Sequence, residues 1–63
     1  AGLPKELAEV LGALDFEPKS TEEIRGLLSA KYPEKHIVTC LMQLCMEDLA
    51  IQVSPGRFCC RRG

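Results

Sequence analysis

Apolar and polar residues alternate with helical spacing in three stretches of this 63-residue chain. In the first stretch, LPKELAEVLGALDF, apolar side chains recur every three or four residues and therefore share one side of a helix. These are Leu3, Leu7, Val10, Leu11 and Leu14. Pro4 suits the first turn of such a helix, where its missing N–H is not needed. The pattern predicts a first helix here.

The next residues, DFEPKS, interrupt the helical pattern. Pro18 disfavours helix at the residue before it and removes a backbone donor. We expect a short extended link with an edge strand of two or three residues around Phe16.

The second helical stretch, STEEIRGLLSAKYP, opens with a capping box formed by Ser20 and Glu23. An apolar stripe follows at Ile24, Leu27 and Leu28. Pro33 ends the stretch, so the pattern predicts a helix of two to three turns followed by a connection.

A third helix is predicted from about Glu34 to Asp48. When residues are placed at about 100° steps, its faces separate. The expected buried side holds Ile37, Val38, Leu41, Leu44 and Cys45. A narrow polar stripe opposite holds His36, Thr39, Gln43 and Glu47. Met42 and Met46 are expected at one border of the stripe with Lys35 beside them, and Cys40 at the other.

The last stretch predicts a β-hairpin, because LAIQV and RFCCR flank a Ser-Pro-Gly turn. Pro55 and Gly56 suit the central positions of a tight turn. Since side chains alternate along a strand, Ile51 and Val53 share one face, and Phe58 and Cys60 share another.

The order of helix, short strand, helix, helix, strand, turn and strand resembles the winged helix-turn-helix superfamily. The segments that carry the resemblance are STEEIRGLL, IVTCLMQLCMEDLAI and the closing VSPGRFCC. The resemblance implies a mostly α fold with a small β hairpin (α+β): one three-helix winged-helix domain, residues 3–62, with a short C-terminal wing. The chain begins Ala1-Gly2-Leu3 without Met, so we expect a domain excised from a larger protein.

Charge and size narrow the function classes. Residues 1–30 carry three basic and six acidic groups, whereas residues 31–63 carry five basic and three acidic groups. This weak basic bias is far from the strong patch of a robust nucleic-acid binder. A chain this short builds a recognition module more easily than an enzyme with a deep pocket, and no stretch is long and apolar enough to span a bilayer.

The four cysteines, Cys40, Cys45, Cys59 and Cys60, lack the close pairing of structural zinc sites. Cys40 and Cys45 lie about 140° apart on a helix, and Cys59 and Cys60 point to opposite faces of a strand. A Cys45–Cys60 disulfide is geometrically conceivable, but we favour reduced thiols packed as small apolar residues in an intracellular protein. We expect no metal and no cofactor.

His36 is the only histidine, and no nucleophile and orienting acid flank it in the pattern of a catalytic base. We expect it to face solvent on the third helix. The domain is accordingly expected to be non-catalytic.

Two interaction functions, and a purely structural one, remain. The resemblance makes assembly in a nuclear transcription, replication or repair complex plausible, with Met42 and Met46 as an adaptable contact surface unless they fill the core. Direct DNA binding by the third helix and the wing is the alternative, and a structural role inside a larger enzyme ranks last. The candidate contact residues are Lys35, His36, Thr39, Met42, Gln43, Met46, Arg57, Arg61 and Arg62. We rank protein binding by a monomeric domain first, because acidic residues near this surface and the absence of arginine from the polar stripe disfavour phosphate and guanine contacts.

Overall fold

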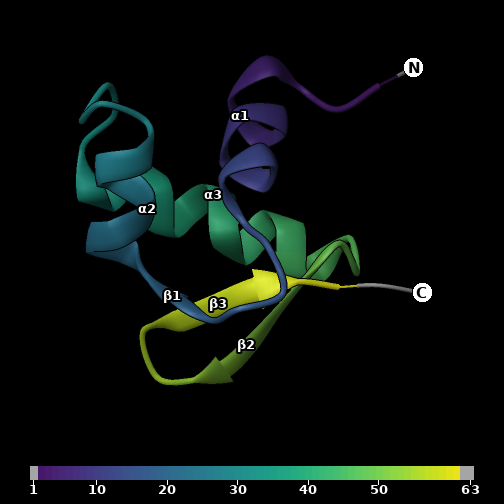
Figure 1. The fold of residues 1–63 in the computed structure, drawn as a ribbon. Helices are drawn as coiled ribbons and strands as arrows, with labels where there is room; N and C mark the ends of the chain where they lie inside the picture. Colours follow the sequence, from purple (N-terminus) through teal and green to yellow (C-terminus); the bar gives the residue numbers. More distant parts are fainter. Residues whose placement is uncertain (1, 62–63) are drawn as a thin grey trace.

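The computed structural model describes residues 2–61, and Figure 1 shows their arrangement. Three helices and a three-stranded antiparallel sheet form an α+β fold within these residues. In chain order the elements are α1 (Lys5–Ala13), β1 (Lys19–Ser20), α2 (Thr21–Leu27), α3 (Glu34–Met46), β2 (Ala50–Ser54) and β3 (Arg57–Cys60). The predicted order of helices and strands is confirmed. None of the helices in residues 2–61 is long and apolar enough to cross a membrane.

The sheet places the last strand in its centre. Its order is β1-β3-β2, so β3 pairs with both other strands and β1 and β2 are edges. The predicted hairpin forms between β2 and β3, and Gly56 adopts a positive φ of 78° in its turn. A positive φ at the second central position, after proline at the first, is typical of a type II turn, and glycine adopts it without a steric penalty.

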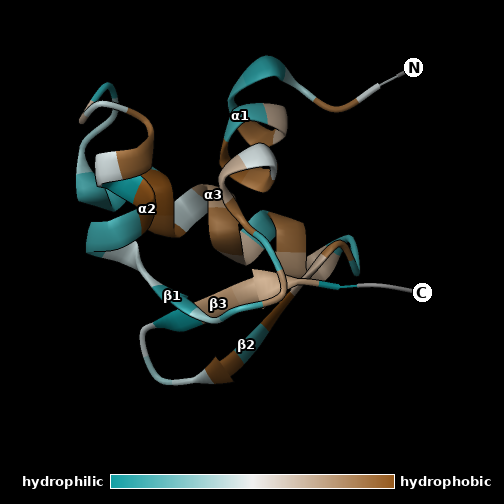
Figure 2. Cartoon of the chain, viewed as in Figure 1, coloured by the Kyte–Doolittle hydropathy of each residue, from teal (hydrophilic) through white to brown (hydrophobic). Residues whose placement is uncertain are grey.

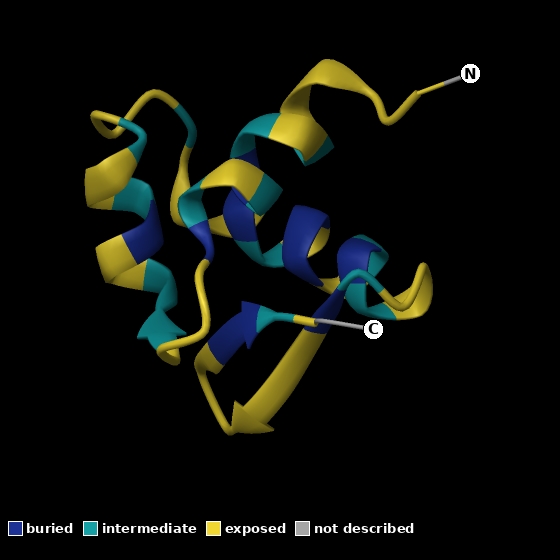
Figure 3. Cartoon of the chain, turned by 45° about the vertical axis from the view of Figure 1, so that its right-hand side comes forward, coloured by how far each residue is buried: buried dark blue, intermediate teal, exposed yellow. Residues whose placement is uncertain are grey.

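The core lies where the three helices meet one face of the sheet. Its fully buried side chains are Val10, Ile24, Ile37, Leu41, Leu44 and Phe58. In Figure 3, the middle of β3 is buried whereas most of β2 is exposed. Because the pairs Ala50–Cys60 and Gln52–Phe58 share one face of the hairpin, Ala50 and Phe58 reach the core together.

The capping box predicted at the start of α2 is present. The Ser20 hydroxyl accepts a hydrogen bond from the Glu23 backbone N–H at 3.1 Å, and the Glu23 carboxylate accepts one from the Ser20 N–H at 3.1 Å. After Leu27 the chain turns through Ser29 and Ala30, which both have left-handed backbone conformations with φ of 58° and 53°. The connection to α3 follows, as predicted.

Helix α3 ends two residues before the predicted boundary. Its last residue is Met46, and Asp48 adopts a φ of 67°. The Leu49 N–H then donates to the Leu44 carbonyl at 2.9 Å, which satisfies a carbonyl that the helix end leaves free. Asp48, which was expected to be the last residue of the helix, therefore lies beyond its end.

The prediction of a strand around Phe16 is wrong. Residues 16 and 17 form a bend, and β1 begins only at Lys19. Asp15 explains the difference, since its side chain accepts a hydrogen bond from the Glu17 N–H at 2.8 Å. This local bond folds the backbone back on itself and competes with an extended conformation.

Candidate interaction surface on helix α3

The outer face of α3, on the side opposite the core, is lined by four of the candidate residues: Lys35, Thr39, Met42 and Met46. Met42 is 44% exposed and Met46 is 80% exposed, the highest value among the large apolar residues that the structure describes. The sequence prediction placed both methionines at a border of the polar stripe. In the structure they lie along the middle of the exposed face.

The buried side of α3 accounts for this change. Ile37, Leu41 and Leu44 are buried as predicted, but Cys40 is also buried, with 4% exposure. Val38 and Cys45, predicted to be buried, are only half-buried. On a helical projection at about 100° per residue, this exchange turns the core-facing side by about 50° and brings Met42 and Met46 outward.

The prediction that His36 faces solvent is wrong. It is half-buried, and its ring centroid lies 4.9 Å from that of Tyr32. Its Nε2 atom is buried and has no hydrogen-bond partner in residues 2–61. A side chain in this position supports packing between α3 and the preceding connection rather than contact with a partner.

Gln43 is also less available than predicted. It is half-buried, and its Nε2 donates to the Glu47 carboxylate at 3.0 Å. It lines a surface hollow with residues of α1, including Leu7 and Leu11. The amide is therefore on the α1 side of α3 and not at the centre of its exposed face.

The wing arginines are engaged by carboxylates. The Arg61 guanidinium lies 2.9 Å from the Asp48 carboxylate, and that of Arg57 lies 3.8 Å from the Glu23 carboxylate. Arg62, the third predicted contact, lies outside the described residues. Lys35, by contrast, is exposed and forms no ion pair with any residue that the structure describes. Among the predicted cations that the structure describes, Lys35 alone is thus unpaired.

The Thr39 hydroxyl already donates its proton in a hydrogen bond within α3. Its Oγ1 donates to the Lys35 backbone carbonyl at 3.0 Å. The hydroxyl can still accept a hydrogen bond from a partner. The outer face of α3 therefore offers two flexible apolar side chains, one ammonium group and one hydrogen-bond acceptor.

All four cysteines are free thiols. Burial raises the pKa of the Cys40 and Cys45 thiols, and the nearby Glu6 carboxylate raises that of Cys40 further. A raised pKa keeps a thiol protonated and weakly nucleophilic at neutral pH. No group of three or more His, Cys, Asp or Glu side chains within residues 2–61 is arranged to hold a metal ion.

Two exposed apolar residues of β2 were not among the predicted contacts. Ile51 is 40% exposed and Val53 is 51% exposed, and the hydrophobic colouring of β2 in Figure 2 falls on a strand that Figure 3 shows as exposed. Alternation in the sequence predicts that they share one face of the strand. In the structure a register shift between Gln52 and Ser54 interrupts the alternation at Val53, and both side chains are exposed.

Comparisons of the chain with protein-family models, with curated proteins and with solved structures find no match.

Proposed function

We propose that this chain is a winged-helix domain that binds another protein through the outer face of α3. The support for the winged helix is the element order together with the placement of β3 between β1 and β2. This arrangement matches three helices followed by a short two-stranded wing. The proposed setting is an intracellular, nuclear complex for transcription, replication or repair, in which the domain is a non-catalytic assembly element.

The observation that carries the protein-binding proposal is the exposure of Met42 and Met46. Their side chains are one helical turn apart and are 44% and 80% exposed, so they do not fill the core. Methionine side chains are flexible and polarizable, and they adapt to varied apolar partner surfaces. Burial of such exposed apolar side chains by a partner removes them from water and stabilises the complex.

DNA binding through α3 and the wing is the second candidate. It is favoured by the exposed and unpaired Lys35 ammonium group. Against it, Arg57 and Arg61 already pair with carboxylates, and those pairs would have to open before the arginines could contact phosphates. Affinity for DNA depends mainly on such phosphate contacts. We therefore rank DNA second.

The methionine content makes a direct test available. Met42 and Met46 are the two methionines of the chain, so photo-methionine labelling places a crosslinker on the outer face of α3 and nowhere else. Irradiation in a nuclear extract is expected to give a discrete protein adduct. Excess unlabelled wild-type domain should suppress that adduct, and so should excess unlabelled Glu22→Gln, which changes a charge at an exposed position of α2. Excess unlabelled Met46→Glu should not. Because Met46 is exposed, Met46→Glu should change the free energy of unfolding by less than about 0.5 kcal/mol.

The same two methyl groups test the DNA alternative. Methyl-labelled methionine gives two NMR signals that both report on the outer face of α3. A mixed-sequence duplex should leave both signals unmoved at about 0.15 M salt, where surface charge contacts are screened. Shifts of both signals that persist at that salt concentration, and are lost in Lys35→Glu, would make DNA the ligand instead.

A further inference from the structure

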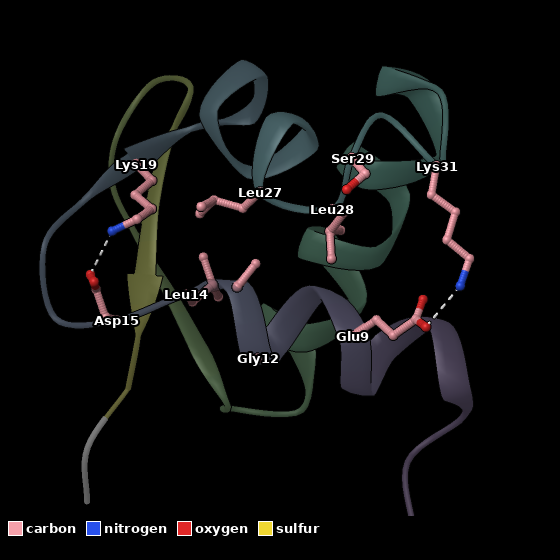
Figure 4. Close-up of a pocket in the computed structure, with 10 residues that line it drawn as sticks. Glu9, Gly12, Leu14, Asp15, Lys19, Leu27, Leu28, Ser29 and Lys31 are labelled. Carbon is pink, nitrogen blue, oxygen red and sulfur yellow. Dashed lines mark hydrogen bonds and ion pairs between the residues drawn. The ribbon is translucent and has the colours of Figure 1, made fainter.

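A cleft between α1 and α2 lies apart from the outer face of α3 and has a volume of about 640 Å³. Figure 4 shows apolar side chains meeting in its middle, with an ion pair at each end. Gly12, Leu14, Leu27 and Leu28 line the middle. Leu27 is 58% exposed, although its neighbours Leu14 and Leu28 pack in or against the core. The cleft is thus an apolar groove open to solvent.

The two ends of the cleft differ in charge. At one end the Lys19 ammonium group lies 2.8 Å from the Asp15 carboxylate. The negative charges of Glu17 and Glu23 also raise the pKa of Lys19. Arg57 adds one further cation near Glu23. Only Asp15 and Lys19 line the cleft at this end, but with their neighbours Glu17, Glu23 and Arg57 the region around it holds three carboxylates and two cations.

The opposite end has the reverse balance. The Glu9 carboxylate lies 2.9 Å from the Lys31 ammonium group and also feels the charge of Lys5. Lys31 in the lining and Lys5 outside it thus give two cations for one carboxylate around this end. Because α1 runs from this end to the Asp15 end, the negative end of its helix dipole adds to the acidic side.

We propose that this cleft binds an amphipathic helix of a partner protein, oriented antiparallel to α1. The positive N-terminal end of such a helix would lie near Asp15, and its negative C-terminal end near Lys31. Its leucine-sized side chains would cover Leu27 and the exposed surface of Gly12. Small-molecule pockets usually enclose most of their ligand, and a groove with Leu27 this exposed does not.

A pair of designed peptides tests both the site and the orientation. The first is a capped helix of about 15 residues, with leucines at i, i+4 and i+7, lysines in its first turn and glutamates in its last turn. The second has the same composition with the two charged turns exchanged. The expected result is amide shifts at Gly12, Leu27 and Ser29 with the first peptide, and affinity about threefold or more weaker with the second. The second peptide has glutamates in its first turn and lysines in its last turn, which stabilise a helix. If helix content alone decided affinity, the second peptide would therefore bind more tightly than the first.

Glycine positions supply matched variants that keep the fold. A Cβ at Gly12 or at Gly26 would meet nothing within 4 Å, but only Gly12 lines the cleft. Both Gly12→Met and Gly26→Met should raise the melting temperature, since glycine disfavours helix. Gly12→Met should weaken binding of the first peptide about tenfold or more by filling the cleft, while Gly26→Met should not.

Other results would overturn the proposal. Equal loss in both glycine variants, or shifts on α3 in place of the cleft, would exclude a helix site between α1 and α2. Cleft shifts that grow with domain concentration in the absence of peptide would assign the groove to a second copy of the chain. Peptide binding should survive Met46→Glu, so this proposal and the α3 proposal fail separately.

Discussion

The Tyr32 hydroxyl donates a hydrogen bond to the Glu9 carboxylate and thereby ties the connection after α2 to α1. The same carboxylate accepts a hydrogen bond from the Lys31 ammonium group at 2.9 Å. The two partners come from 22 and 23 residues further along the chain. This three-residue contact therefore fixes the connection that leads into α3, and its Glu9 and Lys31 side chains line one end of the cleft.

This contact predicts a loss of stability in acid. The hydrogen bonds from Tyr32 and Lys31 lower the pKa of Glu9 in the folded protein. Because the folded pKa lies below the unfolded one, the contribution is present above about pH 4.3, the ordinary glutamate value, and is lost as the pH falls through the lowered pKa. Glu9→Gln should thus be less stable than wild type near neutral pH, and the difference should shrink in acid.

Urea unfolding followed by circular dichroism at a series of pH values measures that difference. Glu22→Gln makes the same change of charge at an exposed position of α2 and serves as the control. A gap between wild type and Glu9→Gln that stays constant down to the lowest pH would show that the carboxylate charge of Glu9 does not stabilise the fold.

The capping box at Ser20 gives a second prediction. Ser20→Ala removes the acceptor for the Glu23 N–H and should lower the free energy of unfolding by about 1 kcal/mol. For a domain of this size that equals a fall in melting temperature of about 4–8 °C. Ser20→Asn keeps a capping oxygen and should remain close to wild type. Equal losses in the two variants would mean that the hydroxyl acts through some other contact.

Features that depend on neighbouring residues could be predicted from the sequence. Ser20 and Glu23 cap α2 as their spacing indicates, and Gly56 forms the turn between β2 and β3. Both involve contacts within four residues, where local chemistry decides the conformation. Phe16 shows the limit, because residues 16 and 17 form a bend in which the Glu17 N–H donates to the Asp15 side chain, and the strand begins only at Lys19.

The faces of α3 could be predicted only in part. Cysteine, valine and methionine occur on several sides of this helix, so its apolar pattern allows more than one centre of burial. Packing of α1, α2 and β2 against α3 selects the centre that buries Cys40 and exposes Met46. The cleft between α1 and α2 could not be predicted, because it arises from the spacing of two helices and not from either sequence alone.

The turn after α2 gives a third prediction. Ala30 holds a left-handed backbone conformation with φ of 53°, which is unfavourable for a residue with a Cβ. Ala30→Gly should relieve this cost, and the greater freedom of glycine in the unfolded chain offsets part of the gain. We expect a net rise in the free energy of unfolding of up to about 1 kcal/mol. Ala8→Gly, in the interior of α1, should have the opposite sign, and a loss in both variants would contradict the role assigned to Ala30.

His36 gives the last prediction, because its Nε2 atom is buried without a hydrogen-bond partner in residues 2–61. A buried polar atom left unsatisfied costs free energy, and replacing it with an apolar group of similar shape removes that cost. His36→Phe keeps a ring beside Tyr32, at the position where the two centroids now lie 4.9 Å apart. It should therefore match or exceed wild type in thermal unfolding at neutral pH, whereas His36→Ala should be less stable through lost packing. A loss of more than about 1 kcal/mol in His36→Phe would instead show that the imidazole nitrogen is hydrogen-bonded in solution.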